Sequence, residues 1–310
     1  MRNISVRVGG SLTALATPFR DGYVDMEALF RLCQRQIERG TAALITCGST
    51  GEAAALSAAE YSDVVVATVG AANPLVPVIA GCCAPSTAAT IALGVEAAAA
   101  GADALLCAPP PYVRPTQDGI VAHIRAVAHA TGLPIVIYDV PSRSGVSIAD
   151  DTLTKMFENE LIVGIKDATA DLSRPPRLRA ACGEGLMQWS GDDATAAAYR
   201  AMGGHGCISV TANVAPRLCA MMHRAWDNGD LRRFAALRDL LDPLHAALFA
   251  ESNPIPLKAA LEAIGLSSSE VRLPLTRATP RTQERLLKLL EQIMIAEEHA
   301  AHGPQYALAS

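Results

Sequence analysis

Leu-Ile-Val-Gly-Ile-Lys-Asp, residues 161–167, is an apolar run that ends in a lysine and an aspartate. Its length and composition predict a β-strand that is buried on both faces. Lys166 is one of four lysines, and the other three lie in polar or helical surroundings, where a lysine normally faces water. Burial disfavours the ammonium form, and a neutral lysine amine can attack a carbonyl to form a Schiff base. The alternative is a lysine that ends the strand and extends its amine to solvent.

Seven further apolar runs lie on either side of this one, with helical segments between them. The eight predicted strands are Leu12–Thr17, Ala42–Cys47, Val76–Ala80, Ala104–Cys107, Pro134–Tyr138, Ile162–Lys166, Leu186–Ser190 and Cys207–Val210. Successive strands end 20 to 33 residues apart, which is the length of one βα unit. The repeat predicts an α/β fold, a (β/α)8 TIM barrel, with a doubly wound open sheet as the alternative. Barrel enzymes carry their active sites at the C-terminal ends of the strands, so the position of Lys166 favours a functional role.

The segments between and after the strands have the pattern of amphipathic helices. Residues 86–100 and 116–130 are the clearest examples, and Gly101 and Gly132 follow them as C-caps. After residue 211 the predicted helices lie near 214–227, 230–250, 255–264 and 280–298. We therefore expect the barrel in residues 1–227 and a C-terminal helical extension in residues 228–310.

The composition argues against several classes of partner and cofactor. The chain has 310 residues and a net charge of −5 without a basic cluster, so we expect no nucleic-acid partner. The first five residues lack an apolar signal core, and charges or turn residues interrupt every long apolar stretch, so we expect a cytoplasmic protein that does not bind membranes. The eight cysteines form no Cys-x-x-Cys pair and the histidines are scattered, so we expect reduced, mostly buried thiols, no metal and no other cofactor.

Other strand ends carry candidate functional side chains. Residues 48–52 read Gly-Ser-Thr-Gly-Glu, a turn whose N–H groups and hydroxyls can hold a carboxylate or, alternatively, cap the next helix. Tyr138 ends the strand next to that of Lys166, where it is either a proton relay or a core tyrosine. Arg143, in a Pro/Ser/Gly loop, either binds a substrate carboxylate or remains solvated. Tyr112 lies on a loop stiffened by three prolines, which suits a contact with a partner subunit.

Together these segments resemble the dihydrodipicolinate synthase / N-acetylneuraminate lyase family of class I, Schiff-base aldolases. The likeness covers nearly the whole chain and includes Ala14–Phe19, Gly48–Glu52, Tyr138–Gly145, Gly164–Thr169, Gly191–Asp193, Gly203–Asn213 and Asn253–Lys258. The resemblance implies that Lys166 forms an imine with pyruvate while Tyr138 relays protons. It also implies that Ser49 and Thr50 hold the pyruvate carboxylate, and that the Ile208 carbonyl faces the same pocket.

The resemblance also implies an assembled, two-substrate site. In the synthase branch Tyr112 crosses a dimer interface and completes a hydroxyl relay with Tyr138 and Ser49, which implies a homo-oligomer, a tetramer built as a dimer of dimers. Arg143 is typical of that branch, where it meets the carboxylate of aspartate semialdehyde, and Gly191 joins the substrate-binding set. Asp139 departs from the pattern, because asparagine is usual there.

The expected function is therefore the condensation of pyruvate with aspartate semialdehyde, in lysine and diaminopimelate biosynthesis. A pyruvate-dependent aldolase that acts on a sugar acid or another aldehyde is the alternative. A catalytically silent paralogue that binds a keto acid is a third possibility, but retention of Lys166, Tyr138 and the Ser49 hydroxyl argues against it.

Overall fold

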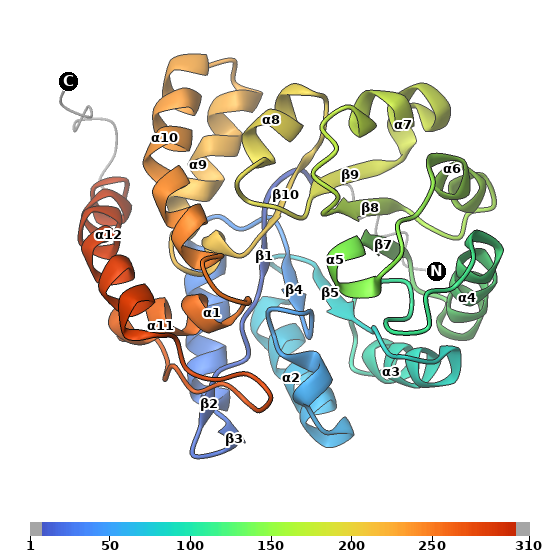
Figure 1. Ribbon diagram of the computed structural model, residues 1–310, viewed down its shortest axis with the longest axis horizontal. Helices are drawn as coiled ribbons and strands as arrows, with labels where there is room; N and C mark the ends of the chain where they lie inside the picture. Colours follow the sequence, from blue (N-terminus) through green and yellow to red (C-terminus); the bar gives the residue numbers. More distant parts are fainter. Residues whose placement is uncertain (1–7, 302–310) are drawn as a thin grey trace.

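The computed structural model describes residues 8–301, and its centre is a closed barrel of parallel strands (Figure 1). The barrel strands are β1 (Gly10–Ala14), β4 (Leu44–Thr46), β5 (Val78–Gly81), β6 (Ala104–Cys107), β7 (Ile135–Asp139), β8 (Gly164–Asp167), β9 (Met187–Ser190) and β10 (Gly206–Ser209). Each predicted apolar run overlaps one of them. Parallel pairing of β1 with both β10 and β4 closes the ring, which confirms the TIM barrel and excludes the open sheet.

A small antiparallel hairpin outside the barrel was not predicted. It consists of β2 (Phe19–Arg20) and β3 (Tyr23–Val24), joined by Asp21 and Gly22. Both turn residues have positive φ, 53° and 84°, as in the two-residue turns whose twist matches that of paired strands. Strands of two residues are too short to show an alternating pattern, so the local signal for this hairpin is the Asp21-Gly22 dipeptide, which is typical of two-residue turns.

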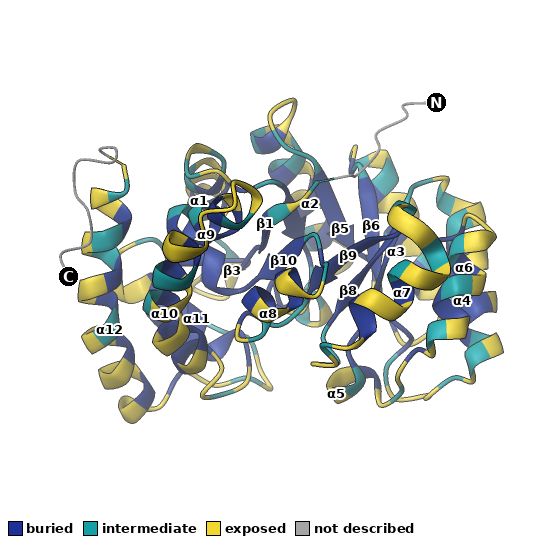
Figure 2. Ribbon diagram, turned by 90° about the horizontal axis from the view of Figure 1, so that it is seen from above, coloured by how far each residue is buried: buried dark blue, intermediate teal, exposed yellow. Residues whose placement is uncertain are grey.

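Helices surround the barrel, and Figure 2 shows buried strands inside helices whose outer faces are exposed. These helices are α1 (Met26–Glu38), α2 (Ala58–Ala72), α3 (Thr87–Ala99), α4 (Gln117–Thr131), α6 (Asp150–Glu158), α7 (Arg174–Cys182), α8 (Ala196–Ala201) and α9 (Pro216–Asp227). Shorter helical turns are η1 (Ala53–Ala55), α5 (Pro141–Ser144), η2 (Gly183–Gly185) and η3 (Thr211–Asn213). As predicted, α4 ends at Gly132, which has a left-handed φ of 64°.

Three more helices follow the barrel: α10 (Leu231–Leu248), α11 (Ile255–Ala263) and α12 (Pro280–His299). The helix α10 packs against α9 and α12, so these helices continue the outer layer on one side of the barrel (Figure 1). We propose that the extension begins after Asp227, between α9 and α10; residues 302–310 lie outside the described residues. Within α12, Leu286 and Leu290 are buried, whereas Leu287 is exposed because it lies about 100° around the helix from its neighbour.

Two expectations from composition can be compared with the described residues. All eight cysteines are free, and six of them are buried, as predicted for small apolar side chains. The exceptions are Cys83, which is exposed, and Cys182, which is partly buried. The first five residues, on which the absence of a signal core was judged, lie outside the described residues. Within residues 8–301, no helix is both long and apolar enough to cross a membrane.

Candidate active site

Lys166 and Tyr138 lie side by side inside the barrel, near the C-terminal ends of β8 and β7. They are direct partners in the register of these two strands. Both side chains are buried, with 6% of Lys166 and 8% of Tyr138 exposed. The Lys166 Nζ atom lies 4.3 Å from the centre of the Tyr138 ring. The predicted proximity of the two residues is confirmed, and the alternative of a lysine that extends into solvent is wrong.

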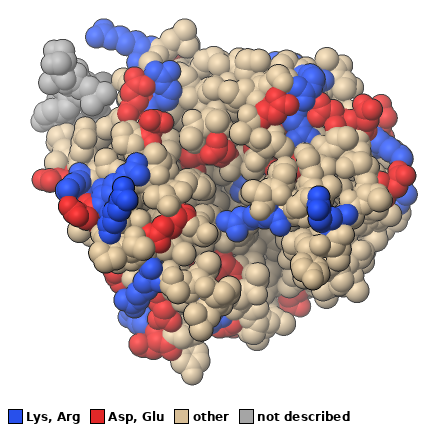
Figure 3. Space-filling view, in the orientation of Figure 1, with Lys and Arg blue, Asp and Glu red and all other residues tan. Residues whose placement is uncertain are grey.

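A cavity of about 540 Å³ opens at these strand ends. Six of the predicted site residues line it: Ser49, Thr50, Tyr138, Arg143, Lys166 and Gly191. The remaining wall includes the segment Phe249–Asn253, which connects α10 to α11. The face seen in Figure 3 is hollowed near its middle, with acidic and basic side chains interspersed around the hollow.

The turn after β4 is shaped by its own backbone hydrogen bonds. The Gly51 N–H donates to the Gly48 carbonyl at 3.1 Å, and the Glu52 N–H donates to the Ser49 carbonyl at 3.2 Å. Within residues 8–301, the N–H groups of Ser49 and Thr50 donate no hydrogen bond. The next helix is capped by Ser57 instead. The helix-capping alternative is therefore wrong for this turn, whose free N–H groups and hydroxyls suit an anionic group.

Gly191 gives Lys166 the space that it occupies. The Gly191 N–H donates to the Asp167 carbonyl at 2.6 Å, which holds the chain after β9 against the end of β8. A Cβ atom at this position would lie 3.2 Å from Cε of Lys166 and 3.0 Å from Cβ of Ala168. A larger residue would therefore displace the lysine side chain or Ala168 by a few tenths of an ångström, so glycine suits this close approach.

Asn253 joins the extension to the barrel at the cavity. Its Nδ2 atom donates to Oγ1 of Thr50 at 3.0 Å, which leaves the Thr50 hydroxyl proton available for another acceptor. Its backbone carbonyl accepts a bond from Nη2 of Arg143 at 3.2 Å. Sequence reasoning assigned Asn253 no role, although it begins the Asn253–Lys258 segment quoted for the family resemblance. The residue contacts two of the predicted substrate-binding side chains at once.

Lys258 corrects an expectation from the sequence. It was expected to face water, but its side chain is completely buried in α11 and forms an ion pair with Glu52. Its Nζ atom donates to the Glu270 carbonyl at 2.8 Å and lies 3.9 Å from the centre of the Phe19 ring. Burial lowers the pKa of Lys258 to about 8, against the opposing effect of the Glu52 carboxylate. The pair connects the turn after β4 to the extension, and its partners are too far apart in the chain for a local pattern to reveal.

Two predicted site residues do not line the cavity. Tyr112 has 93% of its surface exposed and a positive φ of 75°, on the loop between β6 and α4. Ile208 is buried in β10, and the cavity is lined instead by Val210, two residues further along the chain. Within one chain, the structure therefore does not bring Tyr112 together with Tyr138 and Ser49.

Comparison with known proteins agrees with this geometry. Residues 7–293 match the model of the dihydrodipicolinate synthetase family. A 4-hydroxy-tetrahydrodipicolinate synthase from Methylobacterium radiotolerans is 47% identical over 277 residues, which are 89% of this chain and 93% of the relative. A similar solved structure is that of the chloride-inhibited dihydrodipicolinate synthase from Acinetobacter baumannii, complexed with pyruvate. It superimposes with a TM-score of 0.90 at 40% sequence identity, and the match covers 93% of this chain and 99% of that one.

A dihydrodipicolinate synthase variant described as the first monomeric one has the same TM-score of 0.90, at 36% identity, over 93% of this chain and 97% of its own. The similarity thus extends over the barrel and most of the extension, including every residue that lines the cavity. The chain belongs to the dihydrodipicolinate synthetase family.

Proposed function

We propose that the protein is a class I, Schiff-base lyase that condenses pyruvate with aspartate semialdehyde, the reaction of 4-hydroxy-tetrahydrodipicolinate synthase in lysine and diaminopimelate biosynthesis. The observation that carries the proposal is the buried Lys166 amine against the Tyr138 ring at the wall of the cavity. A lysine in such a site is a nucleophile for carbonyl groups. The family of the chain and the activity named for its relatives support the same reaction.

The first half of the reaction forms the nucleophile. The neutral Lys166 amine adds to C2 of pyruvate, and loss of one water molecule from the adduct gives an imine. Removal of a proton from the methyl carbon then gives an enamine. We propose that the Tyr138 hydroxyl carries protons in these steps, because it is the phenol adjacent to the amine. Ser49 and Thr50 hold the pyruvate carboxylate through their hydroxyls and free N–H groups, and Val210 lines the same pocket.

The second half of the reaction forms the carbon–carbon bond. The enamine carbon attacks the aldehyde carbon, whose oxygen takes up a proton, and the imine with Lys166 forms again. The amino group of the aspartate semialdehyde unit then adds to the imine carbon, and the Lys166 amine leaves with a proton, which closes the ring of the product and restores the free amine. We propose that Arg143 binds the carboxylate of aspartate semialdehyde, because it lines the cavity and its orientation is fixed by the Asn253 carbonyl. Gly191 lines the cavity next to Lys166, so it can contact the second substrate through its backbone.

We also propose a cytoplasmic homotetramer, built as a dimer of dimers, in which Tyr112 reaches the cavity of the neighbouring subunit. A tyrosine with 93% of its surface exposed, on a loop after three prolines, suits an interface better than solvent. The eight free cysteines suit a reducing compartment. Light scattering combined with the activity of a Tyr112→Phe variant tests the assembly, and a fully active monomer would contradict it.

Borohydride reduction in the presence of pyruvate tests the proposed function. One reduced pyruvate unit should be found on the peptide that contains Lys166, and the Lys258 peptide should stay unmodified. A Lys166→Arg variant is the control, because it keeps the charge but cannot form the imine. An unmodified Lys166 in the wild-type protein would refute the mechanism. Turnover with aspartate semialdehyde, compared with a panel of sugar-acid aldehydes, then distinguishes the synthase from a different pyruvate-dependent aldolase.

A further inference from the structure

Each of the two candidate catalytic residues is followed by a buried aspartate. Asp139 follows Tyr138, Asp167 follows Lys166, and the two aspartates are direct partners in the register of β7 and β8. Asp139 is fully buried and Asp167 is 3% exposed. Successive side chains of a strand point to opposite faces, so the aspartates point away from the barrel interior, toward the helices.

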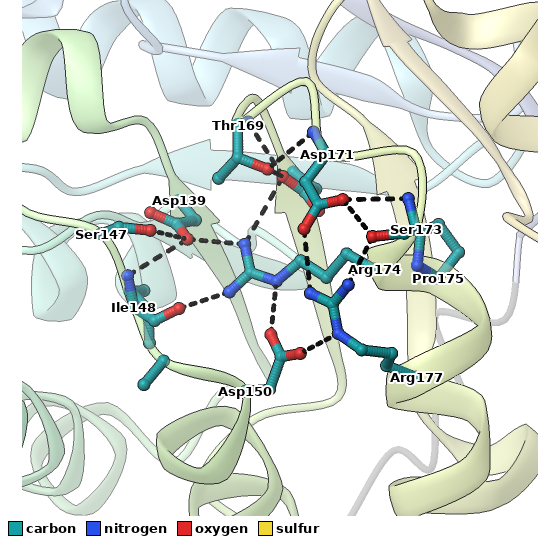
Figure 4. A network of polar contacts seen from close by, with 12 residues as sticks. Asp139, Ser147, Ile148, Asp150, Thr169, Asp171, Ser173, Arg174, Pro175 and Arg177 are labelled. Carbon is teal, nitrogen blue, oxygen red and sulfur yellow. Dashed lines mark hydrogen bonds and ion pairs between the residues drawn. The ribbon is translucent and has the colours of Figure 1, made fainter.

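The guanidinium of Arg174, the first residue of α7, lies between these carboxylates. Its Nη1 atom is 2.7 Å from Oδ2 of Asp139 and 3.6 Å from Oδ1 of Asp167. Its Nε atom donates to Oδ1 of Asp150 at 2.9 Å, and Nη2 donates to the Ile148 carbonyl. Figure 4 shows the Arg174 side chain among Asp139, Ile148 and Asp150, which come from the end of β7, the segment before α6 and the start of α6.

Both aspartates are also held by the segments that follow their strands. Oδ2 of Asp139 accepts bonds from the Ile148 N–H at 3.2 Å and from the Ser147 hydroxyl at 3.3 Å. Oδ1 of Asp167 accepts bonds from the N–H and the hydroxyl of Thr169, at 2.9 and 2.7 Å. These bonds do not involve the arginine, so they hold both carboxylates in the buried cluster independently of it.

Arg174 supplies the positive charge that offsets the buried carboxylates of this cluster. Two buried carboxylates on adjacent strands face this one buried guanidinium, while the third carboxylate, Asp150, is partly exposed and also pairs with Arg177. Without the guanidinium, two like charges would face each other across the strands that carry Tyr138 and Lys166. Such repulsion disfavours the state in which both carboxylates are charged. Either one carboxylate takes up a proton or the two strand ends move apart, and both changes alter the contacts that hold the ends together.

We propose that Arg174 is a positioning residue for the reaction. By holding Asp139 and Asp167 together, it fixes the relative placement of the Tyr138 hydroxyl and the Lys166 amine, which lie one residue earlier on each strand. The inference rests on the proposed function, since it takes imine formation at Lys166 as the step that this placement serves. An ion pair with a structural role alone would affect folding but not the rate of that step.

The test compares Arg174→Gln and Arg174→Lys with an Arg177→Gln control. Arg177 lies on the same helix and also pairs with Asp150, but it bonds to Asp171 rather than to Asp139 or Asp167. Imine formation is followed by stopping the reaction with pyruvate at short times with borohydride, at temperatures where circular dichroism shows each variant to be folded. We expect imine formation in Arg174→Gln to slow by about 10²-fold, as misplaced reacting groups typically cause.

The three variants should differ in the rate of imine formation but not in the amount of pyruvate that each finally traps. Arg174→Lys, which keeps the charge but not the planar fork, should recover part of the rate, and Arg177→Gln should match the wild type. Each protein should still trap one pyruvate per chain at long times. A wild-type rate in folded Arg174→Gln, even with a lowered melting temperature, would overturn the positioning role. If the wild type itself traps no pyruvate, the proposed function fails instead.

A second set of variants keeps the inference testable if Arg174→Gln does not fold. Asp139→Asn, Arg174→Lys and the double variant form a double-mutant cycle. This cycle tests whether the arginine acts through the aspartate. We expect the double variant to form the imine no more slowly than the slower single variant. Rate losses that multiply in the double variant would show that the two residues act independently and would contradict the inference.

Discussion

The Nζ atom of Lys166 lies 4.3 Å from the centre of the Tyr138 ring because the two residues are paired across neighbouring parallel strands. Their separation is set by the strand ladder rather than by a loop. Groups placed in this way lose little freedom when a substrate binds, which favours a reaction that needs an amine and a phenol at the same carbon.

The Tyr138→Phe variant should fold normally but lose most of its turnover. The ring and its contacts remain, whereas the hydroxyl that carries protons is removed. Loss of a positioned proton relay typically lowers a rate by ~10²–10⁴-fold. Steady-state rates with pyruvate and aspartate semialdehyde, together with circular dichroism, check this. Wild-type turnover in the folded variant would show that Tyr138 has only a structural role.

The Arg143→Ala variant should weaken the use of the aldehyde far more than that of pyruvate. A charge-assisted bond to a carboxylate is worth on the order of 2 kcal/mol, so kcat/KM for the aldehyde should fall by roughly 30-fold. Arg125→Ala is a matched control, because Arg125 is an exposed arginine of α4 that does not line the cavity. Equal effects on both substrates, or none on either, would exclude Arg143 as the anchor for the aldehyde.

The Lys258→Met variant should be strongly destabilised. Removal of the ammonium leaves the buried Glu52 carboxylate without its ion pair, and breaking a buried pair costs about 3–5 kcal/mol. Urea unfolding measures the loss, and a Lys258→Met, Glu52→Gln double variant should recover part of it because the unpaired charge is gone. A single variant as stable as the wild type would show that the pair contributes no net stability.

His223 should make the protein less stable in acid. Burial lowers the pKa of His223 to about 3, with a smaller effect from the positive charge of Arg200. The unfolded chain takes up a proton below its ordinary pKa of about 6.5, while the folded chain does not, so stability falls as the pH decreases from 6.5 toward 3. This residue alone should remove about 2 kcal/mol of unfolding free energy by pH 5.

The comparison protein for this measurement is His223→Asn, in which all other titrating groups remain. Urea unfolding at pH 7 and pH 5 should show a smaller difference between the two pH values in the variant than in the wild type. The same pH dependence in both proteins would show that His223 is not the group responsible.

The barrel and much of the cavity wall were predictable because their signals are local. Parallel strands covered on both faces leave short apolar runs, and the barrel geometry then places their ends around one opening. This reasoning brought Lys166, Tyr138 and Ser49 to the same cavity, and the predicted family membership is confirmed.

The residues that were missed depend on partners far away in the chain. Lys258 has the sequence context of an ordinary helical lysine, and only folding places it against Glu52. Arg174 likewise resembles a solvated residue at the start of a helix, until β7, β8 and α6 surround it. Tyr112 has no cavity contact in a single chain, so its predicted role depends on a second subunit that one sequence cannot position.

The hydrogen bond from Asn253 to Thr50 has a practical consequence for protein design. Asn253 belongs to the segment between α10 and α11, so part of the substrate pocket is built by chain that follows the last barrel strand. A copy of this active site in another scaffold must therefore include more of the chain than the barrel. A scaffold that copied only the eight strands and their covering helices would carry the lysine and the tyrosine, but it would lack the wall that orients both Thr50 and Arg143.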